Sequence, residues 1–464
     1  MKHTVLVCGK LEGVQYRAAQ LLASTLLDAT GEYPACIRWA DFSGMEPDKR
    51  YFFLGTAADN GYIREHGTVL NQPEGYALTV KNDVVTIQGA DDGGVLYGCV
   101  DFYAVYLSRM ELTHTCNVYF RDLFAGELPE GEWRSAPSVS RRGLWTWGHV
   151  IYDFRGYIDS MVRLKMNTVI IWNDFLPVNA AELVDYAHSC NVRVIWGYPW
   201  MWDTNCQAIS LENLKEESRR IAAEFETTYA GAGDGVYFQS FTETPQEYIG
   251  DVLIAEAVTD FVNETGAKIL ARHPELELEF GLHAESVREK LEYIKKVDPR
   301  IRIVWENCGA FPFSYLPEDI ANMEQTQALA RRITCLRGAQ ERTGVVLKGL
   351  VNLDWPTFHH QTGPYMMGVT SRQLVENRLE AKKKILHLVQ AGWLVNGEHA
   401  LDMIRLLRDG TRGEIVITAL VEDGLLEKKL FYPVALLGEM LWNCDRPYRE
   451  IAYNTALRQD VEFA

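Results

Sequence analysis

Short apolar runs alternate with amphipathic stretches from residue 141 to the end of the chain. Each run has the length of a strand, and the stretches between the runs carry apolar residues at helical spacing. The runs lie at 143–147, 168–172, 192–196, 236–240, 276–281, 301–305, 345–353 and 414–421. Strands that alternate with helices favour a parallel sheet with right-handed crossovers. The pattern therefore predicts eight β/α units.

Helices are predicted between these strands and after the last of them. The helical stretches lie at 157–165, 180–189, 211–229, 251–271, 287–297, 317–332, 372–395 and 431–442. The long gap at 373–412 implies an extra helix before the eighth strand. A count of eight strands favours a closed (β/α)8 barrel. The alternative is an open, doubly wound sheet, but no GxGxxG motif follows a strand in this sequence.

A smaller α/β pattern precedes the barrel. It comprises a strand at 4–8, a helix at 16–28, a hairpin at 76–80 and 84–87, and a helix at 95–107. The segment 125–140 is rich in Gly, Pro, Ser and Glu, which is typical of a linker. We predict an α/β domain at 1–127, a linker at 128–140 and a barrel at 141–464.

Charged and aromatic residues gather where the predicted barrel strands end. In a parallel barrel, these carboxyl ends carry the loops that form the pocket. The residues are Asp174, Tyr198, Trp200, Glu243, Trp305, Glu306, Asp354, Trp355 and Glu422. Sugars present hydroxyls at the rim of the ring and C–H groups on its faces, so acids together with indoles are typical of carbohydrate sites. Core packing is the alternative for each indole taken alone.

Glu243 ends the fourth predicted strand and is the candidate proton donor. Hydrolysis of a glycosidic bond usually needs two carboxyl groups, one protonated and one ionised. Asp354 and Glu306 both stay open as the second, at about 5 Å from the first for retention or about 6.5–9.5 Å for inversion. We expect Tyr237 and Phe241 to wall Glu243 and raise its pKa. The alternatives are a helix cap for Glu243, and a salt bridge or hydroxyl binding for the other two.

The overall charge narrows the class of ligand. The chain has 46 basic and 63 acidic residues, a formal net charge of −17, which repels nucleic acids and anionic membranes. No apolar run approaches the roughly 20 residues that span a bilayer, and the first residues lack the pattern of a secretion signal. We expect a soluble, cytoplasmic protein whose partner is a small carbohydrate, with no nucleic-acid or membrane partner; a homo-oligomer stays open.

The spacing of cysteines and histidines argues against a metal or another cofactor. The nine cysteines form no CxxC pair and no Cys/His ligand pattern. His283, His359 and His360 have no fixed ligand spacing with the acids. We predict reduced thiols, no metal and no cofactor.

Several of these segments resemble one family of enzymes. Arg142-Gly143, Met166-Asn167, the run 186–195 and the closing helix at 431–442 are similar to family 20 glycoside hydrolases, the β-N-acetylhexosaminidases. The run 89–98 resembles the zincin-like, non-protease domain that precedes such barrels and those of α-glucuronidases. The resemblance covers nearly the whole chain and implies a (β/α)8 barrel behind a zincin-like domain.

The resemblance also implies roles for single residues. By position they are Arg142 as the sugar clamp, Glu243 as the acid, Trp305 and Glu306 as the Trp–acid pair of the sixth strand, Asp354 as a hydroxyl-binding residue and Glu422 as the glutamate of the eighth strand. Asp174, Tyr198, Trp200 and Trp355 complete the predicted substrate contacts. All of these residues are expected at one end of the barrel.

Two positions depart from the family pattern. Thr242 replaces the aspartate that orients the substrate's acetamide, and Leu420 replaces a Trp of the acetamide cage. Because threonine carries no charge, either the protein supplies a second carboxylate or the sugar bears a different 2-substituent. We predict an exo-acting glycoside hydrolase that removes a terminal sugar, either hexosaminide-like or with a different 2-substituent, from a short oligosaccharide or glycoside. The alternatives are a catalytically inactive carbohydrate-binding barrel and, ranked last, an isomerase or lyase acting on phosphorylated sugars.

Overall fold

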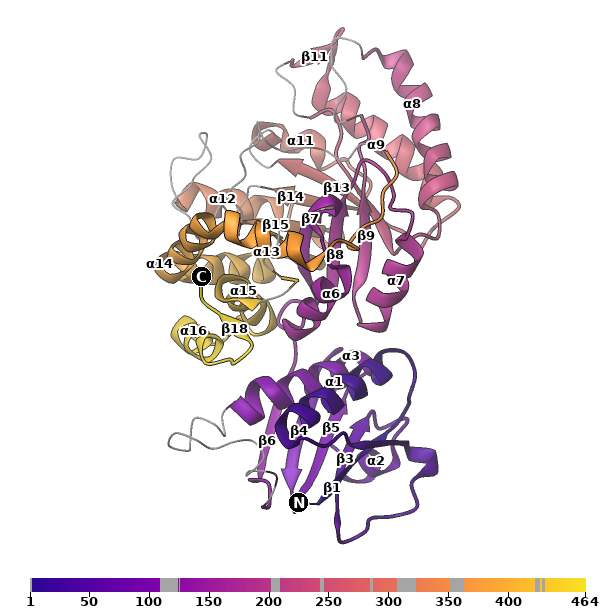
Figure 1. Ribbon diagram of the computed structural model, residues 1–464. Coiled ribbons are helices and arrows are strands. Elements are labelled where there is room, and N and C mark those ends of the chain that lie inside the picture. Colours follow the sequence, from indigo (N-terminus) through magenta and orange to yellow (C-terminus); the bar gives the residue numbers. More distant parts are fainter. Residues whose placement is uncertain are drawn as a thin grey trace.

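Two α/β parts make up the protein, a smaller N-terminal part with its own sheet and a closed barrel (Figure 1). The computed structural model describes residues 2–108, 124, 126–201, 209–242, 246–283, 287–306, 323–350, 363–421, 426–427 and 430–464. Both termini lie on the side of the molecule away from α8 and α9 in Figure 1. The barrel confirms the predicted fold class.

The N-terminal sheet has the strand order β2-β1-β3-β5-β4-β6. Its strands are β1 (His3–Cys8), β2 (Ala35–Arg38), β3 (Lys49–Gly55), β4 (Tyr76–Lys81), β5 (Val84–Gly89) and β6 (Gly131–Ser135). The helices are α1 (Gly13–Thr30), α2 (Gly61–His66) and α3 (Asp92–Asp101), with a 3₁₀ turn at Trp39–Asp41 and a π-helix at Phe102–Leu107. Because β6 pairs with β4, the predicted linker contains the last strand of this sheet.

Local sequence explains where these elements begin and end. Asn60 and Asp91 accept hydrogen bonds from backbone N–H groups in the first turns of α2 and α3, which satisfies donors that helices leave unpaired. Gly31 ends α1 in the left-handed conformation, with φ 78°. Asn82 and Asp83, with φ 49° and 60°, make the two-residue turn of the β4–β5 hairpin.

All eight predicted barrel strands are confirmed, and they close in the order β10-β13-β14-β15-β16-β7-β8-β9. Their bounds are β7 (Arg141–Trp147), β8 (Thr168–Trp172), β9 (Arg193–Gly197), β10 (Gly235–Phe238), β13 (Glu277–His283), β14 (Ile301–Glu306), β15 (Arg342–Leu350) and β16 (Glu414–Val421). Neighbouring strands are parallel throughout. Strand β10 ends at Phe238, two residues before the predicted end at residue 240.

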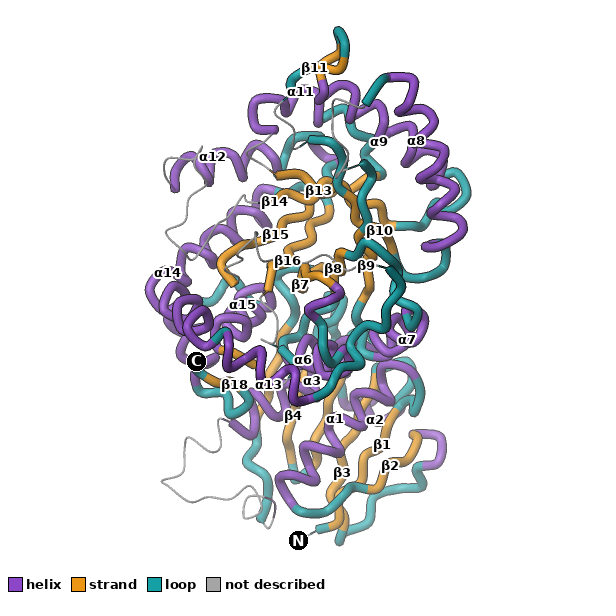
Figure 2. The backbone as a smooth tube through the Cα atoms, turned by 45° about the horizontal axis from the view of Figure 1, so that its top comes forward, coloured by secondary structure: helices purple, strands orange, loops and turns teal. Residues whose placement is uncertain are grey.

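Helices surround the strands of the barrel (Figure 2). They are α6 (Phe154–Arg163), α7 (Ala180–Ser189), α8 (Leu211–Glu224), α9 (Ile254–Leu270), α11 (Leu291–Ile294), α12 (Met323–Ile333), α13 (Arg372–Ala381), α14 (Lys383–Gly410), α15 (Tyr432–Trp442) and α16 (Tyr448–Ala456). Shorter elements are 3₁₀ turns at Gly148–Val150, Arg288–Lys290 and Gly338–Gln340, a π-helix at Phe225–Tyr229, and strands β11 (Tyr248–Ile249), β12 (Val252–Leu253), β17 (Leu430–Phe431) and β18 (Val461–Glu462). The extra helix predicted before the eighth strand is present, since both α13 and α14 precede β16.

Alternation along each strand separates two cores. In β8, Val169 and Ile171 belong to the large core between strands and helices, whereas Ile170 and Trp172 belong to a second cluster inside the barrel. Successive side chains of a strand point to opposite faces, and both faces of a barrel strand are buried. Whether a residue can reach the pocket therefore depends on its parity within the strand.

The N-terminal part covers the foot of the barrel, meaning the end formed by the amino-terminal ends of the strands. Arg142, near the start of β7, is 0% exposed and pairs with Glu74 at 2.7 Å. Asn167 and Asn191, which precede β8 and β9, donate to the same carboxylate at 3.0 and 2.8 Å. The opposite end, the mouth, is formed by the carboxyl ends of the strands and stays clear of these contacts.

Candidate active site

Glu306, the last residue of β14, lies inside the mouth and contacts four donors from three other strands or their ends. Gln239 donates to Oε1 at 2.7 Å, and the Tyr237 hydroxyl donates to the same oxygen. Lys348 donates to Oε2 at 3.0 Å, and His283 Nε2 lies 3.3 Å from that oxygen. The residue is only 4% exposed. The mouth therefore holds a buried carboxylate that is well supplied with hydrogen-bond donors.

These donors keep Glu306 ionised. Burial by itself would raise the pKa of a carboxyl group. Here the Lys348 cation and the hydrogen bonds from His283 and Tyr237 outweigh burial and hold the pKa of Glu306 well below its ordinary value. A carboxyl group whose ionised form is favoured in this way suits the role of an ionised carboxylate better than that of a proton donor.

An aromatic floor lies beside this carboxylate. The Tyr237 ring is 5.9 Å from both Trp145 and Trp172, with edge-to-face geometry, and Trp147 packs edge-on against Trp145 at 5.0 Å. Trp147 and Trp172 are the last residues of β7 and β8. Edge-to-face rings of this kind make a rigid apolar surface. The floor of the mouth thus combines indole rings with one charged cluster.

Two glycines make room for these rings. A β-carbon at Gly281 in β13 would overlap the Tyr237 hydroxyl, which reaches across β13 towards Glu306. A β-carbon at Gly197 in β9 would lie 2.9 Å from the Trp172 ring. Because real β-carbons do not approach other atoms so closely, only glycine at these positions allows the observed packing.

Three predicted aromatic contacts lie elsewhere. Trp200 stacks on Phe238 at 3.6 Å, and Tyr198 stacks on Tyr229 at 4.3 Å. Trp305 is also fully buried and belongs to the large core outside the barrel wall. All three side chains are buried in the large core cluster, which favours the core-packing alternative for Tyr198, Trp200 and Trp305; their contact with substrate stays a prediction.

Arg142, the predicted sugar clamp, lies at the foot of the barrel and is paired within the protein. Its guanidinium pairs with Glu74 and lies over the rings of Tyr97 and Trp442, at 5.3 and 4.9 Å from their centroids. Arg142 therefore joins the barrel to the N-terminal part at the foot.

The remaining predicted residues divide into two groups. Asp174 follows β8 and is half-buried. Burial and the nearby Asp174 carboxylate both raise the pKa of Tyr365. The Tyr365 hydroxyl donates to Asn173 at the mouth. Asp174 thus stays a candidate for substrate contact. The other predicted residues, which lie outside the described residues, are Glu243, Asp354, Trp355 and Glu422.

Sequence reasoning missed most partners of Glu306. The sequence pattern gives no specific signal for Gln239 and Lys348, predicts Tyr237 as a wall of Glu243, and offers His283 no fixed ligand spacing. Phe241, the other expected wall of Glu243, packs on Phe261, while Glu243 itself lies outside the described residues. Strand parity is the signal that could have found two of them, since Tyr237 and Lys348 occupy inward positions of their strands, as Glu306 does.

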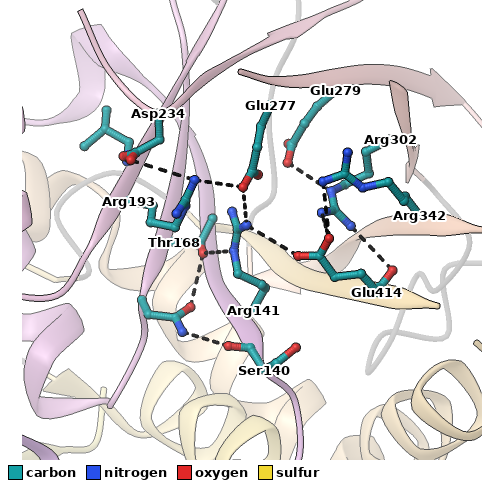
Figure 3. Close-up of polar contacts among 12 residues, drawn as sticks. Ser140, Arg141, Thr168, Arg193, Asp234, Glu277, Glu279, Arg302, Arg342 and Glu414 are labelled. Carbon is teal, nitrogen blue, oxygen red and sulfur yellow. Dashed lines mark hydrogen bonds and ion pairs between the residues drawn. The ribbon is translucent and has the colours of Figure 1, made fainter. Parts of the chain in front are cut away.

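A second, partly buried polar cluster lies at the foot (Figure 3). Arg141 and Arg193 both pair with Glu277, at 2.6 and 2.8 Å. Arg302 and Arg342 both pair with Glu414, at 2.9 and 3.3 Å. These paired charges fill a barrel layer that branched apolar residues usually occupy.

One cavity opens beside this cluster. It has a volume of about 540 Å³ and lies between the N-terminal part and the foot, lined in part by Glu74, Arg141, His188, Arg193 and Asp234. Three acids line the cavity, namely Glu74, Asp91 and Asp234. Each of them already accepts hydrogen bonds from neighbouring protein groups. We place the candidate active site at the mouth, because the catalytic groups of (β/α)8 barrels lie at the carboxyl ends of their strands.

Two further features concern metals and membranes. Within the described ranges, no three His, Cys, Asp or Glu side chains are grouped closely enough to hold a metal ion. None of the helices in the described parts of the chain combines the length and the apolar character needed to cross a bilayer.

Comparison with known proteins places the fold in the class of (β/α)8 barrels. No protein-family model matches the chain, and no curated protein matches it. Among solved structures, it is similar to a GH138 enzyme targeting pectin rhamnogalacturonan II, with a TM-score of 0.54 and 13% identity over 97% of this chain and 65% of that one. It also aligns with CpGH84D, with a TM-score of 0.45 and 14% identity over 98% of this chain and 89% of that one. The first likeness shows a shared fold.

Proposed function

We propose that the protein is a glycoside hydrolase that removes a terminal sugar from a short oligosaccharide or glycoside at the mouth of the barrel. The observation that carries the proposal is the floor of the mouth, where Tyr237 donates to the buried carboxylate of Glu306 and packs against Trp145 and Trp172, with Trp147 beside Trp145. Indole faces suit the C–H surface of a sugar, and charged groups suit its hydroxyls. The fold shared with a GH138 enzyme is consistent with this reading.

The chemistry needs a proton donor and an ionised carboxylate. We propose Glu243 as the donor, on the sequence argument, since it follows β10 at the same end of the barrel. Asp354 and Glu306 are the candidates for the second carboxyl group. Asp174, Trp355 and Glu422 are proposed substrate contacts.

The test is a screen of the purified protein with aryl glycosides of both anomers, including the glucoside, galactoside, glucuronide and N-acetylglucosaminide. Release of the aryl group from one of them is the expected result. Glu243→Gln should then lose most activity on glycosides with poor leaving groups and much less on activated ones, because only poor leaving groups need a proton. Equal loss on both would show that Glu243 is not the acid.

A carbohydrate-binding barrel without turnover is the second candidate. It is favoured by Thr242, which stands in place of a charged residue and whose backbone N–H bonds the Ser240 carbonyl at 2.7 Å. Calorimetry with mono- and disaccharides, run beside the release assay, separates the two functions. A binder gives heat without product, whereas a hydrolase gives product.

A further inference from the structure

Glu306 has no acceptor position left for chemistry. An ionised carboxylate offers about four lone-pair sites on its two oxygens. Tyr237 and Gln239 approach Oε1, and Lys348 and His283 approach Oε2. A carboxylate that attacks an anomeric carbon, or that takes a proton from water, needs one of these lone pairs. In Glu306 the protein's own donors use all of them.

The exposed fractions of the three side chains show that Glu306 lies deeper than Lys348 and His283. The side chain of Glu306 is 5% exposed, while those of Lys348 and His283 are 19% and 30% exposed. The carboxylate therefore lies beneath its two cationic or polar partners, which reach further into the mouth. From below, Tyr237 and Gln239 hold Glu306 in place, and Gly281 leaves the space that the Tyr237 hydroxyl needs.

We propose that Glu306 is a positioning residue: it holds Lys348 and His283 at the mouth for contact with the substrate and is not one of the two reacting carboxyl groups. This inference rests on the proposed function. The ammonium and the imidazole would then offer N–H groups to sugar oxygens, in fixed directions set by one buried charge. The second reacting carboxyl group is then another residue, and Asp354 is the other of the two candidates that the sequence offers.

The first test is chemical rescue of Glu306→Ala with an activated aryl glycoside. A small anion such as azide or formate can replace a missing nucleophile or base, but it cannot restore the direction of two side chains. We expect kcat/KM to fall by about 10²-fold, the cost of a misplaced site, with no recovery in azide or formate. Recovery of more than about tenfold, with a glycosyl azide as product, would overturn the proposal, because the anion would then be replacing Glu306 as the reacting group. A loss of about 10⁴-fold or more would also overturn it, because that is the typical cost of removing a reacting group.

The second test is a double-mutant cycle that uses milder substitutions, so that folding is preserved. Glu306→Gln and Lys348→Met should each lower kcat/KM, and the double variant should lose less than the two single losses combined, since both changes break the contact between Glu306 and Lys348 while only Glu306→Gln also releases His283. Lys348→Arg should recover part of the loss. Glu279→Gln is the matched control, a buried glutamate at the foot of the same lumen, and should leave kcat/KM unchanged. Fully additive losses for Glu306 and Lys348 would contradict the proposal.

A third measurement separates failure of this inference from failure of the proposed function. If the wild-type protein releases no aryl group from any glycoside, the proposed function fails, but the positioning role is still measurable in protein labelled with ¹⁵N-histidine. The His283 signal, assigned by its loss in His283→Gln, should move in Glu306→Gln and not in Glu279→Gln. An unmoved His283 signal in Glu306→Gln would show that Glu306 does not hold the imidazole.

Discussion

Glu306 and Glu279 lie on neighbouring strands of one barrel, with both side chains inside the lumen and almost completely buried. Four donors surround Glu306 at the mouth. At the foot, Glu279 accepts no hydrogen bond from the described residues, and its nearest cation is Arg302, with Nε 3.3 Å from Oε1. The two ends of the barrel thus surround a buried glutamate with opposite numbers of hydrogen-bond donors, many at the mouth and none among the described residues at the foot.

The pKa values of Glu306 and Glu279 differ in the way that their hydrogen-bond donors predict. Burial raises the pKa of Glu279 to about 7, with a further rise from the Glu277 carboxylate, and the arginines offset only part of this. At Glu306 the donors overcome burial and lower the pKa. Burial therefore does not decide the charge of a carboxyl group by itself; the number and direction of its hydrogen-bond donors do.

The largest expected effect comes from removing each carboxylate in turn. Glu306→Met should lower the free energy of unfolding by about 3–5 kcal/mol at pH 7, because Lys348 keeps its charge without its partner. Glu279→Met should cost far less, since Arg302 keeps Glu414 at 2.9 Å. Urea denaturation of both variants measures the difference. Equal losses would show that the donors at the mouth add nothing to stability.

A smaller effect, of opposite sign, is expected for Glu279→Gln. Between the ordinary carboxyl pKa of 4.5 and about 7, the folded protein keeps a proton that the unfolded chain has released, so this side chain makes the fold less stable as the pH rises. The amide cannot ionise. The variant should therefore be more stable than wild type at pH 8, by up to about 3 kcal/mol, and equal to it at pH 4.5. Thermal unfolding at the two pH values measures this, and a loss of stability at pH 8 would contradict it.

The smallest effect is expected from Gly281→Ala. The added methyl group occupies the space of the Tyr237 hydroxyl and should push it away from Glu306, at a cost of about 1–2 kcal/mol. Ultraviolet difference spectra of Tyr237 and denaturation curves measure the displacement and its cost. Gly281→Ala combined with Tyr237→Phe removes the overlapping hydroxyl and should recover part of the stability. No recovery would place the strain elsewhere.

The sequence predicted the fold more fully than the site. The eight barrel strands were recognisable because buried strands and amphipathic helices leave local periodic patterns. The prediction for Glu306 placed it correctly at a strand end, but it assigned the same location to Trp305, the preceding residue. Adjacent residues of a strand point to opposite faces, so at most one of the two could reach the lumen.

Arg142 shows the other limit of such reasoning. Its position at the start of the first barrel strand was consistent with a sugar clamp, since nothing in its sequence neighbours identifies the groups that it contacts. In the folded protein, the Arg142 guanidinium forms an ion pair with Glu74, which belongs to the N-terminal part. The contact between the two parts of the chain, and not the local sequence, assigned this residue to the foot.

By itself, the sequence determined the class of fold and the carboxyl ends at which polar residues gather, because both depend on hydrophobic periodicity over a few residues. Only the tertiary structure decided that Tyr237, Gln239, His283 and Lys348 meet at Glu306 while Glu279 meets almost no donor. The physical reason is that these contacts join strands far apart in the chain, and closure of the barrel sets their distances and directions.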